Sequence, residues 1–265
     1  MAEFSPKRQK GFATVAIVCF FLLYAPIGTL VLYSFNAGAN LALWEGFSLR
    51  WYVAAWENDK VQEAAIRSVV VAFWAALLAT TLATLAALGT TRTRPYRGLT
   101  AVYALINQPL MVPEIVTGVA LLIVFAIVKE ATGYHGLFYL IAAHTAFCVP
   151  FAYLPIRARL EGMDNTLETA AADLYATPWE TFRRITLPLM APGIVAGAML
   201  AFVISLDDVV ITEFVKSAGQ DTLPTYMLGQ LRRVVTPEVN AISTVLLAIS
   251  ILIVSLFFLV TRKRQ

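Results

Sequence analysis

Long apolar runs separated by short polar stretches make up most of this chain of 265 residues. A helix needs roughly 20 apolar residues to cross a bilayer core of about 30 Å. Six runs reach that length, at about residues 11–35, 64–89, 99–128, 137–156, 189–210 and 239–260. Apolar residues occupy both odd and even positions in these runs, whereas the strands of a membrane β-barrel alternate. The pattern predicts an all-α membrane protein with six transmembrane helices in one domain over residues 1–265.

The composition indicates the same class. Hydrophobic residues make up 59% of the chain and charged residues 14%, against about 45–50% apolar residues in soluble domains. We therefore expect lipid around the molecule and no nucleic-acid partner. Cys19 and Cys148 lie inside predicted helices, where we expect them to pack as small apolar residues rather than form a disulfide.

The basic residues indicate how the chain is oriented, because short cytoplasmic loops are enriched in Lys and Arg. Most of them fall on one predicted side of the membrane: Lys7, Arg8, Lys10, Arg92, Arg94, Arg97, Arg157, Arg159, Arg183, Arg184, Arg262, Lys263 and Arg264. We therefore expect both termini in the cytoplasm. The first apolar run is far longer than the h-region of a signal peptide, about 7–15 residues, so we expect an uncleaved helix despite Ala37-Gly38-Ala39.

Two connecting segments carry further signals. The aromatic-rich outer segment at residues 36–63 predicts a short amphipathic element at the interface, either as part of an aromatic belt or as a contact for an external partner. The cytoplasmic loop at residues 157–188 predicts two short helices, at about 166–174 and 178–186. Asn165 with Glu168, and Thr177 with Pro178 and Glu180, are typical of helix caps. The alanines 170–172 either let another backbone approach closely or are there as good helix formers.

Within that loop, Thr169-Ala-Ala-Ala-Asp-Leu-Tyr-Ala176 followed by Ile185-Thr-Leu-Pro188 resembles the EAA loop of ABC importer permeases. Nearly the whole chain resembles PotC-type spermidine/putrescine permease subunits. Besides that loop, the resemblance is carried by the aromatic outer segment around Trp44–Tyr52, Pro113-Glu114-Ile115, Ser205-Leu-Asp-Asp-Val209 and Thr236-Pro-Glu-Val-Asn-Ala241.

The resemblance implies a type I ABC importer permease fold in a bacterial inner membrane. It also implies three partners: a second homologous permease subunit, a cytoplasmic ATPase dimer and an external substrate-binding protein. ATP and Mg would be bound by the ATPase. This chain has no G-x-x-x-x-G-K-[ST] motif, so we expect no ATP site, no catalytic residue, no metal and no cofactor in it. Coupling to the ATPase would fall to Glu168, Thr169, Ala170, Ala171, Asp173, Leu174, Tyr175 and Ala176.

The chain departs from the family pattern at two positions of this loop. The family glutamate aligns with Thr169, and the acid of this chain, Glu168, lies one residue earlier and about 100° around a helix. The family glycine aligns with Tyr175, for which a left-handed conformation would cost roughly 1–2 kcal/mol. Either the turn differs here or packing of the phenol ring offsets the strain.

Four acidic residues in or beside the apolar runs are candidates for a cation path: Glu114, Asp207, Asp208 and Glu213. Ionisable groups in a membrane cost about 2.5–3.5 kcal/mol near its centre and usually face a cavity or a partner. Pro113 is expected to break the third helix and to place Glu114 at mid-depth. Asp207 lies about 27 Å along the fifth helix, in the outer part of the membrane.

Each of these residues also has a structural interpretation. Adjacent helical residues diverge by about 100°, so we expect one aspartate to face the path and the other a neighbouring helix or subunit. Alternatively both are interfacial or pair with Arg232 or Arg233. Glu213 is the weakest path candidate, and His144 is expected to be a hydrogen-bonded core residue.

Carboxylates spaced along a path, with apolar or aromatic walls between them, suit a substrate that carries several ammonium groups. The leading hypothesis is therefore a permease subunit for polyamines. A permease for another small solute is the main alternative, and the net charge of +3 does not distinguish the two. An intramembrane enzyme is a weaker alternative, because the sequence has neither H-E-x-x-H nor G-x-S-x-G. A further alternative is a membrane scaffold that does not transport, and Tyr175 is the only feature that favours it.

Overall fold

The computed structural model describes residues 11–40, 43–93, 96–134, 136–232 and 237–262. Eight residues that carry predictions from the sequence lie outside the described part of the chain: Lys7, Arg8, Lys10, Arg94, Arg233, Thr236, Lys263 and Arg264. The chain forms two compact units. The first comprises Met1–Gln62 and Met227–Ile251, and the second Glu63–Tyr226 and Leu252–Gln265.

The described residues are helical apart from loops and one isolated β-bridge between Asn36 and Phe47. Six helices among them are long and apolar enough to cross a membrane, which confirms the predicted number. They are Phe12–Tyr33 (α1), Asp59–Thr91 (α3), Glu114–Thr132 (α5), Phe138–Glu161 (α6), Pro178–Asp207 and Pro237–Ser255, the last being the described apolar part of α12, Pro237–Arg262.

In the first unit, a loop held by side-chain hydrogen bonds connects α1 to the short helix Arg50–Glu57 (α2). The buried Asn36 side chain donates to the carbonyls of Asn40 and Leu43 and accepts from the amides of Gly38 and Glu45. These bonds satisfy loop groups that have no helical partner. The predicted amphipathic element of the outer segment is therefore α2, held against an ordered loop.

The second unit is built around α6, which packs along Leu187–Asp207 (α9). Small residues make that approach possible, since a Cβ atom added at Gly197 would lie 2.6 Å from the carbonyl oxygen of Ala152. One turn earlier, a Cβ atom at Gly193 would lie 2.7 Å from the Cβ of Arg159. Glycines at this spacing let two membrane helices pack backbone to backbone.

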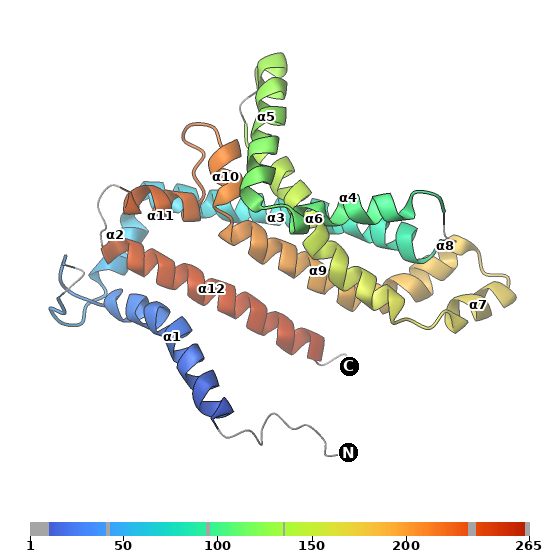
Figure 1. The fold of residues 1–265 in the computed structure, drawn as a ribbon, viewed down its shortest axis with the longest axis horizontal. Coiled ribbons are helices and arrows are strands. Elements are labelled where there is room, and N and C mark those ends of the chain that lie inside the picture. The colour runs from blue at the N-terminus through green and yellow to red at the C-terminus, as the bar shows by residue number, and fades with distance from the viewer. Residues whose placement is uncertain (1–10, 41–42, 94–95, 135, 233–236, 263–265) are drawn as a thin grey trace. The chain divides into compact units, whose positions relative to one another are not determined.

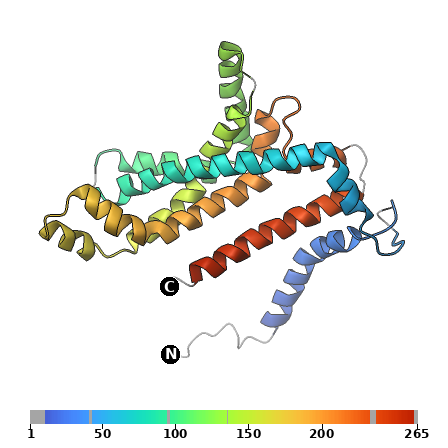
Figure 2. The same cartoon turned by 180° about the vertical axis from the view of Figure 1, so that it is seen from behind.

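The third apolar run is broken, as the proline predicts. Helix α4 ends at Met111, α5 begins at Glu114, and both intervening residues are extended, with ψ of 138° at Val112 and 134° at Pro113. Helix α4 (Leu99–Met111) packs against α6, and α5 runs in a different direction from α4 (Figure 1 and Figure 2). The run predicted as one helix over 99–128 is thus two helices with different directions.

The fifth apolar run begins earlier than predicted. Pro178–Thr181 (α8) continues through a π-helical turn, Phe182–Thr186 (η2), directly into α9. Because Pro188 lacks an N–H and its ring crowds the carbonyl four residues before it, a wider turn at this point relieves the clash without ending the helix. The sequence predicted a separate loop helix at about 178–186, but the structure joins this segment to the fifth membrane helix.

The close packing of α6 on α9 predicts that Gly197→Ala lowers the stability of the purified protein by about 1–3 kcal/mol, because the added methyl group would overlap the Ala152 backbone. The thermal unfolding midpoint in detergent measures this loss. Gly89→Ala in α3 is the matched control, since an added Cβ there meets no atom within 4 Å. Equal midpoints for the two variants would contradict the inferred close approach.

Candidate functional site

Two helices that begin inside the membrane-spanning part of the second unit each carry an acid at their start. Glu114 is the first residue of α5, and Asp208 precedes the short helix Val210–Val215 (α10). Asp208 is extended, with ψ of 133°, and ends α9. Helix amino termini present unpaired N–H groups and partial positive charge, which stabilise carboxylates placed there.

The packing of α5 on α10 brings the two acids together. At Gly118, one turn along from Glu114, a Cβ atom would lie 2.8 Å from the ring of Phe214, so glycine permits the close approach. The carboxyl groups of Glu114 and Asp208 lie close enough to interact electrostatically. Two carboxylates at short range repel each other, so a cation placed between them is favoured.

Residues of α10 and α6 also contact Asp208. One carboxylate oxygen accepts hydrogen bonds of 2.9 Å from both the amide and the hydroxyl of Thr212, and the other accepts from the amide of Ile211. The same Thr212 hydroxyl lies 2.9 Å from His144 Nε2, which is 3.4 Å from Asp208. The His144 Nδ1 atom meets the hydroxyl of Ser205 at 2.7 Å. His144 is thus the hydrogen-bonded core residue that was predicted.

The two aspartates differ in exposure. Asp208 is 7% exposed and faces α5, α6 and α10, whereas Asp207, the last residue of α9, is exposed. The divergence was predicted, but its assumed cause, an unbroken helix through both residues, is wrong. The chain becomes extended at Asp208, and that change of backbone conformation separates the side chains.

Glu213 belongs to a different group of charges. Lys216 contacts Glu213 at 2.5 Å and Asp221 at 2.7 Å. Partial burial opposes the charge on Lys216, but its hydrogen bonds to Asp221 and Glu213 raise its pKa above the usual value. This ion-pair group places Glu213 beside a cation of its own chain.

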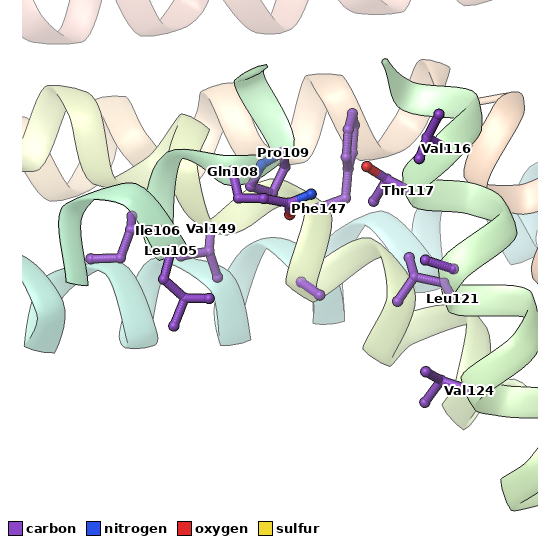
Figure 3. Close-up of a pocket in the computed structure, with 12 residues that line it drawn as sticks. Leu105, Ile106, Gln108, Pro109, Val116, Thr117, Leu121, Val124, Phe147 and Val149 are labelled. Carbon is purple, nitrogen blue, oxygen red and sulfur yellow. The ribbon is translucent and has the colours of Figure 1, made fainter. Parts of the chain in front are cut away.

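An apolar pocket of about 450 Å³ lies between α4, α5 and α6 (Figure 3). Val116, Thr117, Leu121 and Val124 of α5 line one side, and Phe147 of α6 lies close by. The remaining lining residues include Leu105, Ile106, Gln108, Pro109 and Val149. The buried Thr117 hydroxyl has no hydrogen-bond partner among the described residues. Glu114 begins the helix that lines this pocket.

The loop predicted to couple to a partner contains helix α7, Thr166–Asp173. Thr169, Ala170, Asp173, Leu174 and Tyr175 are exposed, Ala171 is buried and Ala176 is intermediate. Asn165 is the N-cap residue of α7, as predicted, but its side chain makes no cap bond. Asp164 accepts the bond from the Thr166 amide instead, and this bond lowers the pKa of Asp164. The cap at Thr177 is confirmed, with reciprocal bonds to Glu180.

Tyr175 has a left-handed backbone, with φ of 59°, so the first of the two predicted alternatives, a turn of another shape, is wrong. Its amide bonds the carbonyl of Ala172, and the amide of Ala176 bonds that of Ala171, both at 3.0 Å. This pair of bonds is the Schellman motif, in which the left-handed residue is usually glycine. The Tyr175 side chain is 95% exposed and that of the neighbouring Leu174 81% exposed. No packing of the phenol ring offsets the strain within the described part of the chain.

Glu168 points into the protein. One of its oxygens accepts a 2.7 Å hydrogen bond from the Thr186 hydroxyl and lies 3.5 Å from Arg92 Nε. Arg92 follows the end of α3, and Thr186 ends the π-helical turn. The acid that the sequence displaces by one position therefore contacts two membrane helices of its own chain.

The fold of the chain, with its broken membrane helices and its helical loop between the fourth and fifth apolar runs, matches that of solved ABC transporters. A bacterial ABC transporter involved in the import of the acidic polysaccharide alginate matches with a TM-score of 0.74 and 16% identity, covering 97% of each chain. The inward-facing MetNI methionine ABC transporter matches with a TM-score of 0.63 and 18% identity, covering 76% of this chain and 94% of that one.

The chain belongs to the family of binding-protein-dependent transport system inner membrane components, whose model matches residues 79–263. The spermidine/putrescine transport system permease protein PotC of Haemophilus influenzae is 41% identical over 94% of this chain and 95% of its own. The putrescine transport system permease protein PotI of Escherichia coli K12 is 38% identical, over 88% and 84%. The chain is therefore a membrane component of a transport system.

Sequence reasoning missed two features of these sites. The first is the partnership of His144 with Ser205 and Thr212, which lie far apart in the sequence and carry no shared pattern. The second is the contact between Arg92 and Glu168. Arg92 was assigned only to the set of basic residues that orient the chain.

The left-handed strain at Tyr175 predicts that Tyr175→Gly stabilises the end of α7 by about 1–2 kcal/mol relative to Tyr175→Ala. Both variants lack the phenol ring, but only glycine adopts the left-handed conformation without strain. Hydrogen–deuterium exchange of the amides in α7 measures the difference, and slower exchange is expected in the glycine variant. Equal exchange in the two variants would show that the conformation is not strained.

Proposed function

We propose that this chain is a permease subunit of an ATP-driven importer for polyamines, such as spermidine and putrescine. The observation that carries the proposal is the meeting of Glu114 and Asp208 at two helix breaks in the membrane-spanning unit. Acidic residues within membrane-spanning segments usually mark a substrate or ion pathway or a proton relay. The similarity to spermidine/putrescine and putrescine permease proteins supports a polyamine as the substrate.

The site suits the chemistry of a polyamine. An ammonium group between Glu114 and Asp208 would offset the repulsion between the two carboxylates. The exposed Asp207 offers a further carboxylate, and the apolar pocket beside Phe147 offers walls for the methylene chain between ammonium groups. Glu213, already paired with Lys216, contributes less.

The chain needs a separate motor. We propose that α7 and the exposed Leu174 and Tyr175 dock on a cytoplasmic ATPase dimer, which binds ATP and Mg and drives alternating access. A second homologous permease subunit and an external binding protein would complete the importer. In this arrangement both termini lie in the cytoplasm of a bacterial cell, and residues 1–265 act as one permease domain without enzymatic activity of their own.

Uptake of labelled spermidine into proteoliposomes tests the cation path. We expect Glu114→Gln to lower kcat/KM of uptake about tenfold to hundredfold, the cost of losing a hydrogen bond to a charged group. Asp207→Asn should raise KM more than it lowers kcat, because Asp207 lies at the exposed end of the group. Asp208→Asn should abolish uptake, because the carboxylate also holds Thr212 and faces His144.

The matched control is Glu130→Gln, which removes an exposed acid from the same helix as Glu114. The amount of assembled complex is measured for every variant, so that a folding defect is not read as lost transport. Unchanged spermidine and putrescine uptake in the Glu114 and Asp207 variants would contradict the cation path. Absence of polyamine uptake by the wild-type complex would favour the alternative, a permease for another small solute.

A further inference from the structure

Glu168 is the acid one residue before the position of the family glutamate, yet its carboxylate turns away from the exposed face of α7. Thr169, Ala170 and Asp173 occupy the exposed face, whereas the Glu168 and Arg92 side chains are only 23% and 18% exposed. The contacts of Glu168 are with Arg92, beyond the end of α3, and with Thr186, in the π-helical turn before α9. Three segments thus meet at a single carboxylate.

The surroundings strengthen this meeting point. A cavity of about 310 Å³ lies beside the ion pair, and its other lining residues are alanine, leucine, proline, phenylalanine and threonine. Arg92 and Glu168 are the charged residues in that lining. Because few other polar groups lie nearby, the charges of Arg92 and Glu168 stabilise each other. Removing one side chain leaves the charge of the other poorly solvated. Arg92 Nη2 is buried without a hydrogen-bond partner among the described residues, which increases that dependence.

The geometry of the π-helical turn adds a second constraint. Thr186 is 5% exposed and its hydroxyl donates to the carboxylate oxygen that also faces Arg92. Single π-helical turns inside longer helices are often found at functional positions. This turn leads without interruption into α9, which ends at Asp207 beside the acidic site. Figure 2 shows α7, α8 and the end of α3 gathered at one end of the second unit.

We propose that Glu168 is a positioning residue that clamps α7 onto the end of α3 through Arg92 and onto the start of α9 through Thr186. Movement of α7 is then passed to both membrane helices as one body, and α9 carries it to Asp207 and Asp208. This inference rests on the proposed function in one respect, that a motor moves α7. It assigns Glu168 an internal role and leaves docking to the exposed residues Leu174 and Tyr175.

The experiment uses the complete importer in proteoliposomes, with spermidine and putrescine as probes. The number of ATP molecules hydrolysed per substrate molecule transported measures coupling. We expect Glu168→Gln to raise that ratio about fivefold or more, which corresponds to the lower end of common allosteric coupling energies. Thr186→Val should raise it too, whereas Thr186→Ser, which keeps the hydroxyl, should not.

Charge reversal distinguishes a specific ion pair from general damage to the loop. Glu168→Arg alone should place two cations together and uncouple the importer. Combining it with Arg92→Glu should restore part of the coupling, because the pair is rebuilt with opposite signs and the Thr186 hydroxyl can accept as well as donate. The matched control is Glu161→Gln, which breaks the exposed pair of Glu161 with Arg157 at the end of α6 and should leave coupling unchanged.

Hydrogen–deuterium exchange of α7 tests the clamp without transport. Faster exchange over residues 166–173 in Glu168→Gln than in the control supports the clamp. A wild-type complex that transports neither polyamine would refute only the proposed substrate, because the exchange measurement does not depend on transport. Unchanged exchange together with unchanged coupling would overturn the clamp. Faster exchange with normal coupling, or no rescue by the reversed pair, would also overturn the transmission of movement through Glu168.

Discussion

The packing of α5 against α10 is the constraint on which the acidic site depends. Each helix begins at a break in an apolar run, and each break leaves backbone N–H groups without helical partners. At α10 those groups are satisfied by the Asp208 carboxylate, and Gly118 allows Phe214 to approach closely enough to bring Glu114 beside it. The acids are thus part of the structure of the breaks as well as candidates for binding a cation.

The same logic explains why Asp208 and Asp207 have different roles. Asp208 is surrounded by donors from Thr212 and Ile211 and by His144, so its position is fixed by several bonds. Asp207 ends α9 and is exposed. In the proposed cation path, the cation would first meet the accessible Asp207 and then exchange it for the fixed Asp208.

The loop that carries α7 combines a strained exposed end with an anchored inner face. Tyr175 adopts a conformation usually left to glycine, and its ring is almost fully exposed. On the inner face, Glu168 connects α7 to Arg92 and Thr186. In the proposed mechanism, the exposed aromatic residue would receive force from a partner, and the anchor would pass the displacement to the membrane helices.

The sequence by itself determined the class, the number of membrane helices, the break at Pro113 and the cap at Thr177, because these follow from local composition and backbone chemistry. It identified Tyr175 as a position where a left-handed backbone would be strained, but only the structure decided that the turn is left-handed and that the phenol ring does not pack. Only the tertiary structure decided which aspartate is buried, that Glu114 meets Asp208, and that Glu168 faces Arg92. Those contacts join residues of separate helices. A sequence pattern with the period of one helix states which face a residue occupies, but not which helix lies opposite.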